Sequence, residues 1–246
     1  MGDRILIIPD VHGRQFFWSE LRDPDEYSHI IFLGDYLDPY PIEGITWKLA
    51  ESTLYQIVDY KKKNPEKVTL LLGNHDLPYL SEAVQGYGTS DRFNETAVPR
   101  LRQFFTENRS LFKMAWQTEI DGETYLFSHA GVIRGWLEQN GLTETWEKIS
   151  TDKLADWLDN MSYTEDGIIK LGQCGSARWG WEQFGSPTWA DWIEILEDGR
   201  AIRDGVYQIV GHTMSRSRNA RIELYAACLD CIDQCFVKDS DGIKKV

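Results

Sequence analysis

The 246-residue sequence predicts an α/β fold, and two observations lead to that prediction. Short apolar segments at residues 4–8, 29–33 and 68–72 are typical of strands, and helical segments lie between them. This β-α-β-α-β order predicts parallel strands joined by right-handed crossovers. The third segment has no polar alternation, so both of its faces should be covered, as in a layered α/β protein.

The composition is that of a folded protein. Hydrophobic residues make up 42% of the chain and charged residues 26%, which excludes a disordered protein. The longest apolar runs are too short to span a bilayer. The first residues lead directly into a strand and lack the basic, apolar and cleavage regions of a signal peptide. We therefore expect a cytoplasmic protein that folds as one domain over residues 1–246.

The net charge of −13 argues against general nucleic-acid binding. A nucleotide or a phosphoprotein remains open as a substrate, because bound divalent cations would reverse the sign of the charge locally.

The four cysteines are too few for a disulfide scaffold, and we expect reduced thiols at Cys174, Cys228, Cys231 and Cys235. A zinc site is the alternative. It is disfavoured because positions 228 and 231 of a strand would point to opposite faces of the sheet.

The other elements follow in chain order. The sequence predicts a short helix at 15–21 and an amphipathic helix at 45–62, whose basic end lies near the negative pole of the helix dipole. Later elements are a mostly helical stretch at 77–117 with a loop at 87–91, strands at 124–127 and 206–210, and a closing hairpin at 222–225 and 235–237.

Residues 136–204 are the least regular part of the chain. They hold seven of the ten tryptophans: Trp136, Trp146, Trp157, Trp179, Trp181, Trp189 and Trp192. We expect this segment to be mainly core, lying near the substrate side. A rim of tryptophans would instead be able to stack on a nucleobase.

Polar motifs end five of the apolar segments. They are Asp10-x-His12, Gly34-Asp35-x-x-Asp38, Gly73-Asn74-His75-Asp76, His129-Ala-Gly131 and Gly211-His212-Thr213. Side chains at the carboxyl ends of strands in an open α/β sheet converge on one crevice. Gly73 allows a sharp turn, and Asp76 is either a partner of the site or a helix cap. The one histidine outside the motifs, His29, is interpreted as structural.

This donor set contains hard oxygen and borderline nitrogen atoms and no thiolate. It suits Mn²⁺, Fe or Zn²⁺. There are enough donors for two ions, and ions about 3.5–4 Å apart can clamp a phosphoryl group for in-line attack.

The order of the five motifs resembles the calcineurin-like metallophosphoesterase superfamily, within it the phosphoprotein-phosphatase-like branch that also contains bacterial serine/threonine phosphatases and diadenosine tetraphosphate hydrolases. The motifs span residues 10–212. The resemblance implies a layered β-sandwich flanked by helices (α/β/β/α) and a dinuclear metal centre, most readily with Mn²⁺.

The resemblance also implies residue roles. Asp10 and His12 would hold the first metal, Asp35 would bridge the two, and Asn74, His129 and His212 would hold the second. His75 would protonate the leaving oxygen and Asp38 would orient His75.

One position departs from the family pattern. An arginine that binds the substrate phosphate usually follows Gly-Asp-x-x-Asp, and this chain has Pro39 and Tyr40 there. Arg14 and Arg178 are the candidates for replacing it.

The sequence thus predicts an enzyme, a metal-dependent phosphatase that hydrolyses phosphate monoesters, phosphoserine and phosphothreonine included, by attack of a metal-bridging hydroxide. The alternative is a hydrolase of dinucleoside polyphosphates or other nucleotides. A third hypothesis, an inactive phosphate-binding module, is motivated only by the missing arginine.

Overall fold

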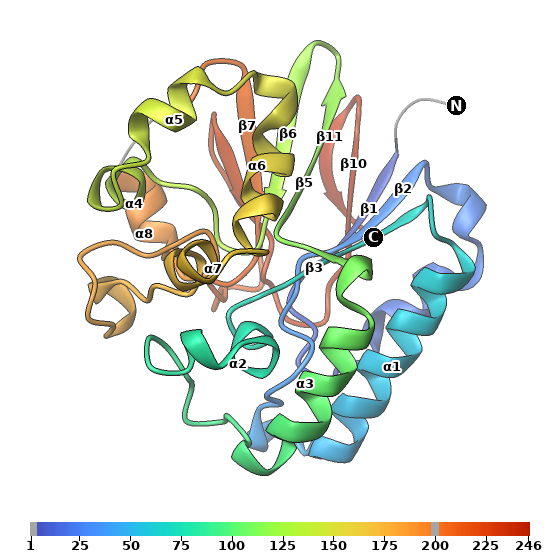
Figure 1. Ribbon diagram of the computed structural model, residues 1–246. Coiled ribbons are helices and arrows are strands. Elements are labelled where there is room, and N and C mark those ends of the chain that lie inside the picture. The colour runs from blue at the N-terminus through green and yellow to red at the C-terminus, as the bar shows by residue number, and fades with distance from the viewer. Residues whose placement is uncertain (1–3, 198–201) are drawn as a thin grey trace.

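The computed structural model describes residues 4–197 and 202–246 and contains two β-sheets (Figure 1). The first sheet has the strand order β11 (Gly242–Lys245), β10 (Phe236–Asp239), β1 (Ile5–Ile8), β2 (His29–Phe32), β3 (Val68–Leu71) and β4 (Phe112–Lys113). Strands β1 to β4 are parallel, as the β-α-β order predicts, and β10 and β11 add an antiparallel edge.

The second sheet has the order β5 (Ala115–Ile120), β6 (Glu123–Ser128), β7 (Val206–Val210), β9 (Ala226–Cys228) and β8 (Arg221–Ile222). Strands β6, β7 and β9 are parallel to one another, whereas β5 and β8 pair antiparallel. The predicted strands at 124–127 and 206–210 are confirmed.

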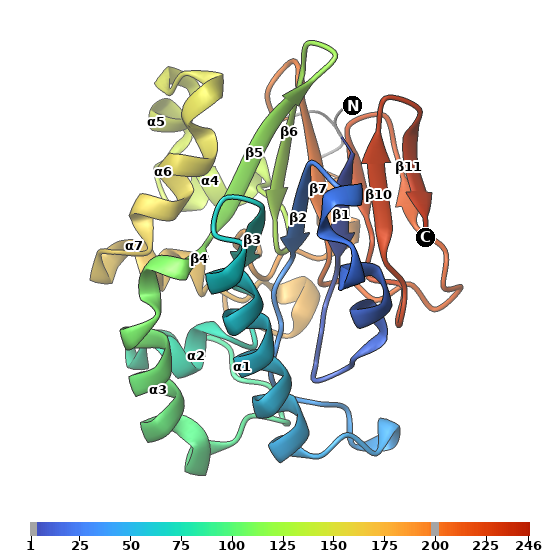
Figure 2. The ribbon, with the colours of Figure 1, turned by 90° about the vertical axis from the view of Figure 1, so that its right-hand side faces the viewer.

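The helices cover the outer faces of both sheets. The first sheet is covered by α1 (Trp47–Lys63) and α3 (Val98–Glu107), and the second by the helices that follow β6 (Figures 1 and 2). The remaining helices are α2 (Leu77–Leu80), α4 (Arg134–Gln139), α5 (Thr143–Lys148), α6 (Leu154–Met161), α7 (Glu165–Leu171) and α8 (Trp192–Glu197). Two sheets flanked by helices on each side are the α/β/β/α arrangement that the family resemblance implied.

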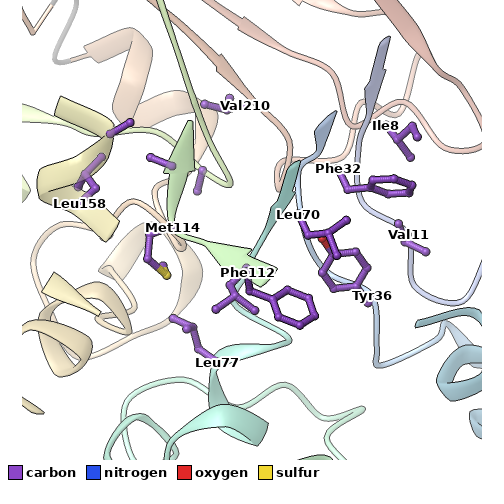
Figure 3. Close-up of a cluster of buried hydrophobic side chains, with 14 of the residues drawn as sticks. Ile8, Val11, Phe32, Tyr36, Leu70, Leu77, Phe112, Met114, Leu158 and Val210 are labelled. Carbon is purple, nitrogen blue, oxygen red and sulfur yellow. The ribbon is translucent and has the colours of Figure 1, made fainter. Parts of the chain in front are cut away.

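The strands bury side chains on both faces, with a period of two. One face of each sheet packs against the other sheet through Ile5, Ile7, Ile31, Tyr125, Phe127 and Ile209. The opposite faces pack against the helices, and Figure 3 shows part of this second cluster, including Ile8, Phe32, Leu70 and Val210. Burial on both faces explains why these strands have no polar alternation in the sequence.

Three expectations about the elements are wrong. The first is helix up to residue 117, because β4 and β5 occupy 112–120. Strand β5 turns into β6 through Asp121 and Gly122, both at positive φ. An Asp-Gly pair between strands is a strong hairpin signal, so the sequence held the information.

The second concerns the irregularity expected of residues 136–204, because the described residues of this range contain most of α4 and the whole of α5 to α8. These helices have six to eight residues each, too short for clear periodicity. The third is the closing hairpin. Its two halves lie in different sheets, because β10 pairs with β1 while β8 and β9 extend the second sheet.

Helix α1 forms as predicted. Thr46 caps its first turn by accepting from the backbone N–H of Leu49 at 3.2 Å, and three lysines occupy its last turn. None of the helices in residues 4–197 and 202–246 combines the length and the apolar character that a membrane span requires. That residues 1–246 form one domain stays a prediction.

Candidate metal centre

The five polar motifs meet at one edge of the two sheets. Asp10 and His12 follow β1, Asp35 and Asp38 follow β2, and Asn74 and His75 follow β3. His129 follows β6 and His212 follows β7, in the other sheet. All eight side chains are at most 8% exposed. We use the name strand-end cradle for the six predicted metal ligands, Asp10, His12, Asp35, Asn74, His129 and His212.

The backbone of the cradle and of the neighbouring Asp38 is strained and tightly hydrogen-bonded. His12, Asp35, Asp38 and His212 all have φ between 45° and 63°, a left-handed conformation that costs about 1–2 kcal/mol for a residue other than glycine. The loops after β1 and β2 remain paired beyond the strands, for example from the N–H of His12 to the carbonyl of Asp35 at 2.6 Å. Strain of this kind, held by surrounding bonds, is typical of functional sites.

Two glycines leave room for the carboxylates. A Cβ at Gly73 would lie 2.1 Å from Asp35 Oδ1, and one at Gly211 would lie 2.3 Å from Asp10 Oδ2. The φ of Gly73 is outside the left-handed region, so its importance is this close approach and not the sharp turn that the sequence suggested.

Asp35 lies between two groups of donors that could each hold a metal ion. One group is His12, Asp35 and His75, and the other is Asp35, His129 and His212. Asp35 Oδ2 is 3.5 Å from His12 Nε2 and 3.4 Å from His129 Nε2. A single carboxylate shared between two groups is the arrangement expected of a bridging ligand.

Asn74 and Asp10 complete the surroundings. Asn74 Oδ1 lies 2.9 Å from both His129 Nε2 and His212 Nδ1. The Asp10 carboxylate accepts from the backbone N–H of His212 at 3.0 Å and lies 4.0 Å from His129 Nε2. The cradle therefore joins side chains from both sheets.

The protonation of the histidines tests whether a cation fits here. Nδ1 of His12 lies 2.8 Å from the carbonyl of Leu37, and Nδ1 of His129 lies 2.7 Å from that of Leu33. A carbonyl only accepts, so each Nδ1 carries the proton, and in a neutral ring Nε2 holds a lone pair. Both lone pairs face acceptor oxygens of the cradle, chiefly Asp35. Acceptors facing acceptors repel one another unless a cation lies between them, so the donor set fits a metal ion.

The pKa shifts agree with this picture. Burial lowers the pKa of His129, but the carboxylates of Asp35 and Asp10 outweigh burial and raise it to about 10. Burial raises the pKa of Asp35, yet the neighbouring imidazoles, His129 foremost, bring it well below its usual value. Burial keeps the pKa of His12 and of His212 well below the usual range. When no metal is bound, a proton on His129 thus supplies positive charge beside Asp35.

Asp76 supports the cradle from behind and does not cap α2. Its Oδ2 accepts from the backbone N–H groups of Asp35 at 2.8 Å and Gly73 at 2.9 Å, and its Oδ1 accepts from that of Tyr36 at 3.0 Å. No side-chain cap bond is made at this helix start. Burial and the charge of Asp35 raise the pKa of Asp76 well above its usual value, while the N–H donors oppose that shift. Of the two roles considered from the sequence, the structure favours the partner of the site.

His75 and Asp38 form a pair next to the cradle. Nδ1 of His75 lies 2.7 Å from Asp38 Oδ2, which leaves Nε2 facing Asp35 Oδ2 at 4.0 Å. The Asp38 carboxylate also accepts from the hydroxyls of Tyr79 at 2.6 Å and Ser90 at 3.2 Å. Asp38 is thus fixed by three donors and in turn fixes the ring of His75. Tyr79 and Ser90 were not expected from the sequence.

The two arginines predicted to bind phosphate are both paired with carboxylates. Arg14 donates to both oxygens of Glu43, at 2.8 and 2.9 Å. Arg178 Nε lies 2.5 Å from Asp191 Oδ2, and its Nη2 donates to the hydroxyl of Thr213 at 2.8 Å. Both lie beside the cradle, and their role in binding substrate stays a prediction.

A third arginine lies at the site and was not expected from the sequence. Arg92 Nη2 is 3.0 Å from His75 Nε2, and Arg92 also donates to the carbonyl of Asp38. It lies in the loop between α2 and α3, where no local pattern marks an active-site residue.

The tryptophans of residues 136–204 differ in burial. Trp136, Trp146 and Trp192 are buried, as expected of core residues. Trp179 and Trp181 are 94% and 91% exposed, so for these two the expectation of core packing is wrong. They line a cleft of about 340 Å³ with Trp189, whose ring is 5.7 Å from that of His212.

The four cysteines are free and buried, as expected of reduced thiols. In the part of the chain that the structure describes, no cysteine belongs to a group that could hold a metal.

Two metal-capable donor groups share a buried carboxylate at the strand ends of an α/β/β/α fold, which is the arrangement of a metal-dependent hydrolase. Residues 3–216 match the family described as calcineurin-like phosphoesterase, so the chain belongs to that family. The family resemblance noted in the sequence is confirmed.

Known proteins support the same assignment. A Schizosaccharomyces pombe protein provisionally named a serine/threonine-protein phosphatase is 30% identical over 99 residues, which is 35% of this chain and 29% of that protein. The chain thus spans less than a third of this curated relative.

Two solved structures share the fold. The cold-active protein-tyrosine phosphatase of a Shewanella species superposes with a TM-score of 0.56 at 13% identity, covering 100% of this chain and 78% of that one. A serine/threonine phosphatase of Saccharomyces cerevisiae gives 0.51 at 16% identity, covering 99% and 79%.

Proposed function

We propose that this protein is a dimetal phosphatase that hydrolyses phosphate monoesters, including phosphoserine and phosphothreonine. The observation that carries the proposal is the shared carboxylate of Asp35, whose Oδ2 lies within 3.5 Å of an imidazole nitrogen on either side. The serine/threonine-protein phosphatase name of the Schizosaccharomyces pombe relative supports this substrate class.

In this proposal Asp10, His12 and Asp35 hold one ion, and Asp35, Asn74, His129 and His212 hold the other. Mn²⁺ suits these donors best, and Fe or Zn²⁺ are compatible with them. When bound, the two ions supply an activated water molecule and positive charge around the phosphoryl group.

Residues beside the metal centre would transfer a proton to the leaving oxygen. When its ring is protonated on both nitrogens, His75 is positioned to give the Nε2 proton to the leaving oxygen, because Asp38 fixes its ring through Nδ1. Burial of the whole site strengthens these electrostatic interactions. The phosphorylated substrate is the expected partner, and a cytoplasmic location stays a prediction.

Metal removal tests the proposal. Hydrolysis of p-nitrophenyl phosphate should require added Mn²⁺, stop in EDTA and return with excess Mn²⁺. Asp35→Asn should lower kcat/KM by about 10³-fold, because the ions contribute several kcal/mol to the transition state. Metal analysis should show fewer bound ions in this variant. The exposed Asp121→Asn is the matched control.

Activity that is indifferent to chelation would contradict the proposal. Unchanged metal content and turnover in Asp35→Asn would instead favour the third hypothesis, an inactive phosphate-binding module.

A second candidate function is the hydrolysis of dinucleoside polyphosphates or other nucleotides. The exposure of Trp179 and Trp181 favours it, since two free indole rings beside the centre can stack on a base. The kcat/KM values for diadenosine tetraphosphate and a phosphoserine peptide separate the two functions. A Trp179→Ala/Trp181→Ala variant should lose activity on the nucleotide alone, and a large preference for the peptide removes this candidate.

A further inference from the structure

The missing arginine after Asp38 leaves a question about how the substrate phosphate is bound. The chain has Pro39 and Tyr40 at this place, and neither carries a positive charge. A phosphate monoester is a dianion near neutral pH, and planar guanidinium groups are the side chains that best match its oxygens. Binding of the phosphate therefore calls for another guanidinium that reaches the reacting position.

Arg92 is the arginine that contacts His75, the proposed proton donor. Its Nη2 lies 3.0 Å from Nε2 of His75, and another of its nitrogens donates to the carbonyl of Asp38. Since Nδ1–H of His75 donates to Asp38, Nε2 accepts from Arg92 in the absence of substrate. Arg92 thus occupies the place where a leaving oxygen would meet His75.

Tyr40 provides the support for this guanidinium. The Arg92 guanidinium lies 3.7 Å from the centre of the Tyr40 ring, within the range of a cation–π contact. The Tyr40 ring lies 5.0 Å from the ring of His12, a predicted metal ligand. Tyr40, at the position after Pro39, thus connects the cradle to Arg92. A cleft of about 540 Å³ opens along Tyr40, Trp47 and Arg92.

Arg92 differs from Arg14 and Arg178 in whether its charge is paired with a carboxylate. The latter two each bind a carboxylate, of Glu43 and of Asp191. Among residues 4–197 and 202–246, no carboxylate oxygen lies within 4.0 Å of the Arg92 guanidinium. Its current partners, a carbonyl and an imidazole, are neutral acceptors. The positive charge of Arg92 is therefore available to bind an anion.

We propose that Arg92 binds the phosphoryl oxygens of the substrate, with Tyr40 holding its guanidinium in place. The loop between α2 and α3 thereby supplies the cation that the Gly34-Asp35-x-x-Asp38 motif lacks. This inference rests on the proposed phosphatase function.

Inorganic phosphate is the probe that tests this role without turnover. Calorimetric titration of the Mn²⁺-loaded protein should show that Arg92→Ala weakens phosphate binding by at least about tenfold, as expected for a lost hydrogen bond between charged groups. Arg92→Lys should recover part of the affinity, because it keeps the charge and loses the planar fork. Tyr40→Phe should bind like the wild type, and Tyr40→Ala should be weakened.

The matched control is Arg100→Ala. Arg100 is 48% exposed on α3 and pairs with Glu51 away from the site. Metal content and melting temperature, measured for each variant, should agree between Arg92→Ala and this control. In steady-state assays on p-nitrophenyl phosphate, Arg92→Ala should mainly raise KM if the guanidinium binds the ground-state dianion.

Phosphate affinity in a folded Arg92→Ala equal to that of Arg100→Ala would overturn the role of Arg92 and leave the phosphatase function standing. If Arg92→Ala does not fold, the near-isosteric Arg92→Gln decides by the same criterion. A wild type that binds phosphate tightly through Arg92 but hydrolyses no phosphate ester would overturn the proposed function and support this inference.

Discussion

The strand-end cradle and the loops around it differ in how their residues are held. The cradle is buried, and backbone N–H groups fix its carboxylates, as the bonds from His212 to Asp10 and from His75 to Asp35 show. The surrounding rim, defined as Arg92, Trp179 and Trp181, lies on loops and is half-buried or exposed. Arg92 is positioned by contacts of its side chain with the Tyr40 ring, with His75 and with the carbonyl of Asp38, and not by a backbone ladder.

The difference follows from what each region has to do. Two cations need donors at fixed places, and residues next to strand ends cannot move far. A substrate phosphate needs charge that can approach it, and a side chain on a loop provides that. We infer that changes in the cradle abolish chemistry, whereas changes in the rim alter how tightly a substrate is bound.

The largest loss of activity is expected from a substitution of His75, which lies between the cradle and the rim. His75→Asn should keep both ions and lower kcat by about 10²–10⁴-fold for substrates with poor leaving groups, since general acid catalysis is lost. For p-nitrophenyl phosphate the loss should be much smaller, because its leaving group needs little protonation. Metal analysis and a series of aryl phosphates provide the measurement. Equal losses across the series would count against proton donation.

A substitution of Asp76, which binds the backbone of the cradle loops, should have a smaller effect. Asp76→Asn places an amide N–H₂ against at least one of the three backbone N–H groups that Asp76 now accepts from. The affinity for Mn²⁺ should fall by about 10–100-fold, as for other residues that orient metal ligands. Metal titration of this variant against Asp121→Asn measures the effect. An unchanged affinity would show that the cradle does not depend on Asp76.

His29 gives the smallest effect and serves as a reference outside both regions. Its ring stacks on Trp116 at 4.1 Å and its Nε2 lies 2.9 Å from the hydroxyl of Thr69. Burial, with a smaller contribution from Lys61, lowers its pKa to about 4. The unfolded chain, with a histidine pKa near 6.5, then binds more protons below that pH. The stability contributed by His29 is full above pH 6.5 and is lost as the pH falls towards 4.

The measurement is urea unfolding at pH 7.5 and 5.0 for the wild type and His29→Phe in EDTA. Between these values the wild type should lose about 1–2 kcal/mol more than the variant. Groups common to both proteins cancel in this difference. The same loss in both would mean that His29 titrates normally in the folded state and would contradict the lowered pKa of this histidine.

Part of the fold could be predicted from the sequence and part could not. The parallel order of β1, β2 and β3 follows from their segments and the helices between them. The pairing of β10 with β1 joins residues more than 200 positions apart, and no local pattern indicates it. The β5–β6 hairpin was predictable from Asp121 and Gly122 but was missed.

The sequence by itself determined which side chains form the cradle, because each comes directly after a strand and parallel strands end at the same edge. Only the tertiary structure decided that Arg92 reaches His75, that Asp76 holds the Asp35 loop, and that Trp179 and Trp181 face solvent. The physical reason is that these contacts depend on how loops and helices pack after folding. A residue next to a strand end is placed by the sheet itself, whereas the path of a long loop depends on the surfaces against which it packs.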